Sequence, residues 1–145
     1  VLFVLGLILV LNNRKSPEIV QPISPIMSDD NGDSAAEEIM TPATGGYTNY
    51  DSSHLSFANE GKVVLFFNAK WCPTCRALTK DVQSKISEIP EDVLILSIDY
   101  DSEKELKKKY GITYQHTLVQ IDSLGNQIKK WSGSPNLESL LSNIQ

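Results

Sequence analysis

The two cysteines of this 145-residue chain are separated by two residues, in the run Cys72-Pro73-Thr74-Cys75. Thiols at this spacing on the first turn of a helix come within reach of a disulfide bond. The thiolate form of a cysteine both attacks disulfides and binds metals. The same spacing also occurs in half of a zinc knuckle. The pair therefore predicts either thiol–disulfide exchange or metal binding, and its neighbours decide between the two.

The cysteine pair lies where a buried strand is expected to become a helix. Residues 63–67 (VVLFF) are apolar and rich in β-formers, which is typical of a strand buried on both faces. Cys72 then falls at the N-cap of a helix predicted to extend to about Glu88, and Pro73 fits the first helical turn. Unpaired backbone N–H groups and the positive end of the helix dipole favour a thiolate at Cys72. The predicted apolar face of this helix consists of Ala77, Leu78, Val82 and Ile86.

The rest of the chain from Tyr47 onward alternates between helix and strand patterns. Two strands joined by a helix should be parallel, and a hairpin should add antiparallel strands, so helices cover both faces of a mixed sheet. The predicted fold is an α/β sandwich. Its elements are a helix (51–59), a strand (63–67), a helix (72–88), a strand (93–98), a helix from Asp101 or Ser102, with Glu105 as capping partner, to Tyr110-Gly111, a hairpin (117–121 and 127–131) and a last helix capped by Ser134-Pro135.

These residues resemble a known family. The run 67–75 (FNAKWCPTC) is similar to the thioredoxin-family motif F-x-A-x-W-C-x-x-C, and residues 110–112 with 117–119 resemble that family's Y-G-(I/V)…P-T-L stretch. The match covers roughly residues 50–145. The resemblance implies a thioredoxin-like three-layer sandwich and a thiol–disulfide oxidoreductase that acts on protein or small-molecule disulfides. Such an enzyme exchanges electrons with an upstream redox partner and needs no cofactor.

The resemblance also assigns roles by position. It implies that Cys72 is the exposed attacking thiol, that Cys75 is the resolving thiol, and that Trp71 shields the pair. Gly133 falls where the family has a glycine that lines the substrate groove. The substrate contacts expected in this way are Trp71, Pro73, Thr74, Gln115, His116 and Gly133.

Two positions depart from the family pattern. His116 stands where the family has a cis-proline facing the disulfide, and a cis bond before a non-proline residue costs about 3 kcal/mol, so we expect a reshaped loop. Phe66 stands where thioredoxins keep a buried acid that assists proton transfer to the resolving thiol. We expect His116 to serve as the base instead. The other histidine, His54, is interpreted as a surface residue.

Two other functions remain compatible with these residues. Cys72, Cys75 and His116 together offer two thiolates and an imidazole to copper, zinc or an iron–sulfur centre, with a fourth ligand from water, a partner or a second subunit. A non-catalytic adaptor would leave the intact cysteine pair unexplained. Thiol–disulfide exchange is the leading prediction.

Residues 1–46 differ in texture from the rest of the chain. Residues 1–11 (VLFVLGLILVL) are apolar and, as a helix, would span about 16 Å, so we interpret them as the remnant of a signal anchor or transmembrane segment. Residues 12–46 hold four of the seven prolines and lack periodicity, which predicts a disordered tether. We expect a membrane-anchored protein whose domain, residues 47–145, faces the extracytoplasmic side. That domain has eleven basic and twelve acidic residues and no basic patch, which argues against nucleic-acid binding.

Overall fold

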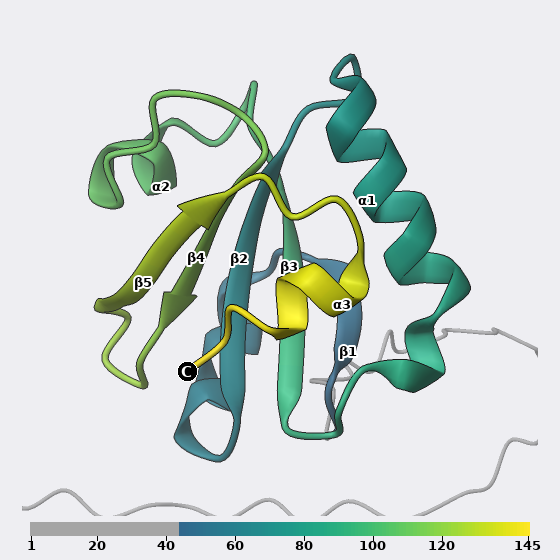
Figure 1. Ribbon diagram of the computed structural model, residues 1–145. Coiled ribbons are helices and arrows are strands. Elements are labelled where there is room, and N and C mark those ends of the chain that lie inside the picture. Colours follow the sequence, from purple (N-terminus) through teal and green to yellow (C-terminus); the bar gives the residue numbers. More distant parts are fainter. Residues whose placement is uncertain (1–43) are drawn as a thin grey trace, which may run out of the picture. The chain divides into compact units, whose positions relative to one another are not determined.

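The computed structural model describes residues 44–145, which form a five-stranded mixed sheet with strand order β1-β3-β2-β4-β5 (Figure 1). Strands β1 and β2 are parallel to β3, β4 is antiparallel to β2, and β5 is antiparallel to β4. The strands are β1 (Gly46–Asn49), β2 (Lys62–Asn68), β3 (Val93–Asp99), β4 (Thr117–Ile121) and β5 (Gln127–Ser132). The helices are η1 (Ser52–Asn59), α1 (Pro73–Ser84), η2 (Ile86–Glu88), α2 (Lys104–Lys109) and α3 (Leu137–Leu141). The predicted anchor, 1–11, and nearly all of the predicted tether, 12–46, lie outside the described residues.

Both faces of the sheet are covered, which confirms the predicted three-layer sandwich. Alternate residues of β2 point to opposite faces, and each set joins a different core. One core packs α1 and α3 against the sheet, and the other packs η1 and α2 against it (Figure 1). The first core includes Val64, Phe66, Cys72, Cys75, Leu78, Val82, Leu137 and Leu140. The second includes Val63, Leu65, Phe67, Leu94, Leu96, Tyr110 and Val119, with Leu55 and Leu106 against it.

Strand β1 is absent from the sequence-based prediction, which began the domain with a helix. Its four residues, GYTN, carry no run of β-formers, so local pattern does not reveal it. Tertiary pairing creates the strand, because Tyr47 lies in register with Ile95 of β3. Just before it, the Gly45 N–H donates to the Glu91 carbonyl oxygen over 2.7 Å. A Cβ on Gly45 would overlap neighbouring carbonyl oxygens, so the close approach requires glycine there.

Helix α1 is shorter than predicted. It ends at Ser84, and the 3₁₀ helix η2 follows it. Ile86 is therefore exposed rather than on the buried face of a continuous helix, and Ala77 is exposed as well. Leu78 and Val82 are the predicted apolar positions that α1 does bury.

Two other helix starts differ from prediction, and side-chain hydrogen bonds explain both. The Asp99 carboxylate accepts the N–H groups of Asp101 and Ser102, which makes a turn there, and α2 begins only at Lys104. Helix α3 is capped by Asn136, whose Oδ1 accepts the Ser139 N–H over 2.9 Å, rather than by Ser134-Pro135. The predicted end of α2 at Tyr110-Gly111 and the hairpin of β4 and β5 are both confirmed.

The register between β2 and β4 determines where the site forms. Phe67 is paired with Thr117, so the residue before Thr117 lies beside the end of β2. The His116 N–H donates to the Phe67 carbonyl oxygen over 2.9 Å. The chain leaves β2 at this same end to enter α1 through Cys72. The loop that precedes β4 is thus held against the first turn of α1.

Candidate active site

Cys72 caps the N-terminus of α1, as the sequence predicts. Its backbone is extended (φ −79°, ψ 118°), Pro73 takes the first helical position, and the Cys72 Sγ accepts the Cys75 N–H over 3.3 Å. Both cysteines are free thiols. A helix N-terminus leaves its first N–H groups without backbone partners, and here one of them is directed at the sulfur.

The hydrogen bonds at Cys72 favour its thiolate. Burial alone would raise the pKa of Cys72, but hydrogen bonds from Cys75 and Thr74 outweigh it and hold the pKa below its ordinary value. The Thr74 Oγ1 lies 3.1 Å from the Cys72 Sγ. The expectation of an exposed thiol is wrong, however, because only 3% of Cys72 is accessible.

Cys75 is the opposite case. Burial raises its pKa to about 12, and the hydrogen bond to Cys72 and the nearby Cys72 charge add to this effect. Backbone groups of Ala69 and His116 act in the other direction without cancelling it. The two thiols therefore differ in the chemistry available to them: Cys72 ionises first, and Cys75 retains its proton.

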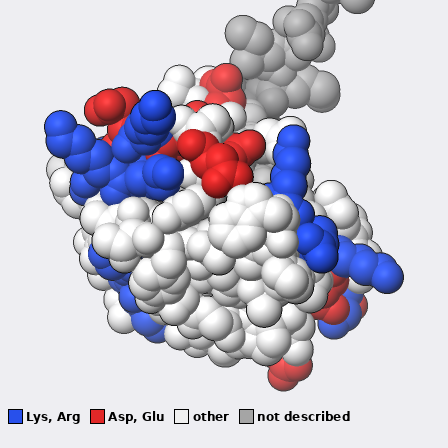
Figure 2. Space-filling view, turned by 90° about the horizontal axis from the view of Figure 1, so that it is seen from above, with Lys and Arg blue, Asp and Glu red and all other residues white. Residues whose placement is uncertain are grey.

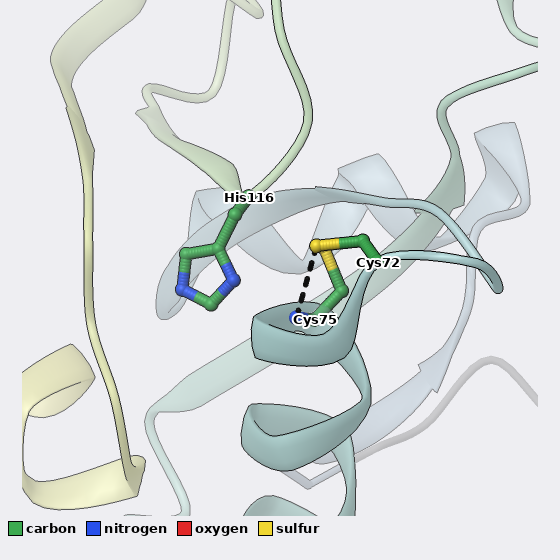
Figure 3. A group of neighbouring side chains, drawn as sticks. All are labelled: Cys72, Cys75 and His116. Carbon is green, nitrogen blue, oxygen red and sulfur yellow. Dashed lines mark hydrogen bonds between the residues drawn. The ribbon is translucent and has the colours of Figure 1, made fainter.

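His116 faces the cysteines from the loop before β4 (Figure 3). Its φ of 61° is left-handed, which is uncommon for a residue other than glycine. The Nε2 atom lies 2.8 Å from the Ser134 carbonyl oxygen. A carbonyl oxygen only accepts, so Nε2 carries the proton and the lone pair of the neutral ring is on Nδ1. Nδ1 is buried, has no hydrogen-bond partner within residues 44–145, and is the ring nitrogen turned toward the two sulfurs in Figure 3.

The position beneath the cysteines is apolar. Phe66 is fully buried and packs its ring edge-to-face with the His116 ring, with centroids 5.6 Å apart and an angle of 78°. No Asp or Glu side chain is buried in the part of the chain that the structure describes. Among the His, Asp and Glu side chains of residues 44–145, only that of His116 thus shares a buried cluster with the two thiols.

A shallow groove of about 270 Å³ lies next to the thiols. It brings together four predicted site residues that are distant in the sequence: Thr74, Gln115, His116 and Gly133. Four more residues line the groove without having been predicted as site residues: Tyr114, Ser132, Ser134 and Pro135. Of these four, only Tyr114 could have been suspected from the sequence, because it is an aromatic residue two positions before His116. Its side chain is 55% exposed in the structure. All eight lining residues are uncharged if His116 is neutral.

Seen from the end of the molecule that carries the site, basic side chains gather on two sides with acidic side chains between them, and a wide adjoining area is uncharged (Figure 2). The body of the chain is also nearly balanced in charge. A protein that docks on the uncharged area would therefore be recognised by shape complementarity and by hydrogen bonds to backbone groups rather than by charge.

Two residues expected at the substrate surface lie outside this groove. Trp71 is 57% exposed, and its Nε1 donates to the Asp101 Oδ2 over 3.0 Å, so it turns toward the start of α2. Pro73 is exposed on the first turn of α1. Trp131 is partly buried against the core that contains α1 and α3. His54 is half-buried rather than a surface residue.

Comparison with known proteins identifies the family. The family model described as Thioredoxin matches residues 47–145. The chain belongs to the thioredoxin family. It is 30% identical to the thioredoxin of Chlamydia trachomatis over 81 residues, which cover 56% of this chain and 78% of that protein. It is also 31% identical to a thioredoxin H-type from rice, Oryza sativa, over 60% of this chain and 71% of the relative.

Solved structures agree with this assignment. Fasciola hepatica thioredoxin superposes with a TM-score of 0.53 and 30% identity, over 62% of this chain and 84% of that one. Trxlp from Edwardsiella tarda has a TM-score of 0.56 over 66% and 95% of the two chains, and at 17% identity it supports the fold alone. This family member, with its Cys72/Cys75 pair, is a thiol–disulfide oxidoreductase.

None of the helices between residues 44 and 145 is both long and apolar enough to cross a membrane.

Proposed function

We propose that Cys72 is the attacking thiol and Cys75 the resolving thiol in exchange with protein disulfides. The observation that carries this assignment is the hydrogen bonding of the Cys72 Sγ, which accepts the Cys75 N–H and contacts the Thr74 hydroxyl. These contacts favour the thiolate that attack requires, while burial keeps Cys75 protonated until it is needed.

The two cysteines can carry out the whole exchange reaction without a cofactor. The Cys72 thiolate attacks one sulfur of a substrate disulfide, a mixed disulfide forms, and the first substrate thiolate leaves. The Cys75 thiol then loses its proton and attacks the Cys72 Sγ, which releases the second substrate thiolate and leaves the Cys72–Cys75 disulfide. Two electrons pass to the substrate, and an upstream redox partner returns them. The same steps in reverse oxidise a dithiol.

The second step needs a base, which we assign to the Nδ1 of His116. The hydrogen bond from Nε2 to Ser134 leaves the Nδ1 lone pair free and directed at the thiols. The facing ring nitrogen and the two sulfurs all lie within 4.8 Å of one another. Phe66 occupies the place where an acid could otherwise accept this proton. His116 would therefore take the Cys75 proton and return it to the departing thiolate.

The groove supports a peptide segment as the substrate. No hydrogen bond within residues 44–145 uses the backbone N–H or carbonyl of Gln115, so both groups remain available to an extended chain. Gln115 lies between Tyr114 and His116 in the lining of the groove, and Gly133, with a φ of 83°, lines it as well. Such backbone pairing recognises polypeptides without selecting a sequence.

Trapping of mixed disulfides tests the roles of the two cysteines. We expect Cys75→Ser to accumulate covalent complexes with a disulfide-bonded protein such as insulin, because nothing resolves the intermediate. We expect Cys72→Ser to accumulate none, and both variants to lose turnover. Equal trapping by the two variants, detected on non-reducing gels, would contradict the assignment.

We further propose that residues 1–11 anchor the protein and that the domain works outside the cytoplasm. The support is the uninterrupted apolar run at 1–11, followed by the proline-rich stretch to residue 46. We expect the full chain to remain in membranes after alkaline carbonate washing and to be digested by protease added to cells whose cell wall and any outer membrane have been removed. A variant without residues 1–11 is the matched control and should be released. Retention of that variant, or protection from external protease, would overturn this proposal.

A further inference from the structure

We propose that the reduced site binds one Zn²⁺ ion through the Sγ atoms of Cys72 and Cys75 and the Nδ1 atom of His116. The three side chains are buried, and their ligand atoms lie within 4.8 Å of one another. They come from two separate parts of the fold, the first turn of α1 and the loop before β4 (Figure 3). Zinc binding goes beyond disulfide exchange, which needs no metal.

The orientation of His116 is what a metal ligand requires. Its Nδ1 is a buried polar atom without a partner among the described residues, an arrangement that is unfavourable unless a ligand occupies the lone pair. Its other nitrogen donates to the Ser134 carbonyl oxygen, and metal-binding histidines commonly make such a bond, because it sets the tautomer and aims the ring. The contact with Phe66 holds the ring from a second side.

The donor set fits zinc. Thiolates and imidazoles are the ligands that Zn²⁺ prefers, and cysteines two residues apart are a common zinc-binding pair. Bonds of about 2.3 Å to sulfur and about 2.0 Å to nitrogen place tetrahedral ligand atoms about 3.5–3.8 Å apart. Rotations of the side chains would bring three atoms now within 4.8 Å to that separation.

The fourth position is left for a small ligand. The cluster holds no further His, Cys, Asp or Glu within the portion of the chain that the structure describes. A water molecule or an added thiol would complete the tetrahedron, as in zinc sites with three protein ligands. A four-ligand iron–sulfur cluster would need a second chain, which is why a single zinc ion is the better match.

Binding of the metal has a chemical consequence for the site. Zn²⁺ binds the Cys72 thiolate and displaces the proton of the Cys75 thiol, and no electrons move. Both sulfur atoms and Nδ1 are then occupied, so the zinc form cannot attack a disulfide, and the oxidised form has no thiolates to offer. This regulatory consequence depends on the proposed exchange mechanism, whereas zinc binding itself does not.

Metal titration of the full chain, reduced and metal-free in mild detergent, tests the proposal. We expect one equivalent of Zn²⁺ to bind in competition with a chromophoric chelator, and Co²⁺ to give a thiolate charge-transfer band. His116→Asn tolerates the left-handed backbone but lacks a ring nitrogen, and should weaken Zn²⁺ binding by at least about 100-fold. The matched control is His54→Asn, which changes the chain's other histidine and should bind as the unaltered chain does.

A second substitution of His116 and a folding control separate loss of a zinc ligand from loss of the fold. His116→Gly, which suits the φ of 61°, should also lose binding, and circular dichroism should show both His116 variants folded. The proposal is overturned if either folded variant retains the full affinity, if the oxidised protein binds equally well, or if Co²⁺ gives no thiolate band. Insulin reduction by the metal-free protein measures the exchange function separately. We expect Zn²⁺ to inhibit that reduction and a chelator to restore it.

Discussion

The Nε2 of His116 and the carbonyl oxygen of Ser134 lie 2.8 Å apart, and this contact joins the loop before β4 to the loop after β5. The bond fixes the proton on Nε2 and leaves Nδ1 directed at the cysteines. The side chain that replaces the family's proline is therefore oriented by a neighbouring loop, not by its own segment. Both the proposed proton transfer and the proposed zinc site depend on this orientation.

Replacing His116 by proline should damage the loop. The family resemblance suggests that proline would restore a familiar loop, but the structure indicates the opposite. Proline holds φ near about −65° and lacks the N–H that His116 donates to Phe67, whereas φ here is 61°. We expect His116→Pro to lower the free energy of unfolding by about 2–4 kcal/mol. His116→Asn is the control, and urea denaturation should show a loss of less than about 1 kcal/mol for it. Equal stability of the two variants would mean that the loop adjusts freely.

The two thiols should differ in their reaction with small alkylating reagents. The pKa of Cys72 lies below its ordinary value and burial raises that of Cys75 to about 12, so at neutral pH a far greater fraction of Cys72 than of Cys75 should be thiolate. Although only 3% of Cys72 is accessible in the static structure, the reagent is small and Cys72 is the more ionised thiol, so we expect one iodoacetamide label on Cys72, with a rate that rises with pH through the Cys72 pKa. Peptide mapping by mass spectrometry locates the label. Thr74→Val should move the midpoint of this profile upward, because it removes one hydrogen bond to the thiolate. A label found first on Cys75 would refute the prediction.

Asp81 should make stability depend on pH in the acidic range. Its Oδ2 accepts the Leu137 N–H over 2.8 Å and its Oδ1 lies 3.0 Å from the Lys85 amine, and these contacts lower the pKa of Asp81 in that order. Because the folded pKa is depressed, the stabilisation is present above the unfolded value of about 3.9 and is lost as pH falls through the folded pKa.

Urea denaturation at several pH values should reveal this contribution. We expect Asp81→Asn to be less stable than the unaltered chain at pH 6 and the gap to close in acid. Lys85→Gln keeps the Leu137 hydrogen bond, so most of the pH dependence should survive in it. A gap that does not vary with pH would show that the Asp81 charge is not involved.

Strand β1 should contribute measurably to stability despite its four residues. A chain that begins at Thr44 retains the Gly45–Glu91 hydrogen bond and the pairing of β1 with β3, whereas one that begins at Tyr50 loses both. We expect the shorter chain to lose about 3 kcal/mol, since each backbone hydrogen bond contributes about 0.5–1.5 kcal/mol. Thermal unfolding of the two truncated chains measures the difference. Equal midpoints would show that β1 adds nothing to the sheet.

Much of the scaffold was predictable because it depends on local patterns. The apolar runs that became β2 and β3 are long enough to be buried on both faces, and the hairpin turn is marked by Asp122 and Gly125. Helix starts and the edge strand were less predictable. The Asp99 carboxylate delays α2, and β1 exists only because β3 offers it hydrogen-bonding partners. The local sequence around Asp99 and β1 does not predict these contacts.

Some features of the candidate site also follow from local sequence, and others only from the tertiary structure. By itself, the sequence determined that Cys72 caps a helix beside Cys75, because N-cap position, Pro73 and spacing are properties of one short segment. Only the tertiary structure decided that Cys72 is buried and that the Nδ1 of His116 faces it. The pairing of β2 with β4 brings His116 to the cysteines, and the Ser134 carbonyl turns its ring. The orientation of the His116 ring depends on the loops before α1, before β4 and after β5, and no local sequence pattern specifies how these three loops pack together.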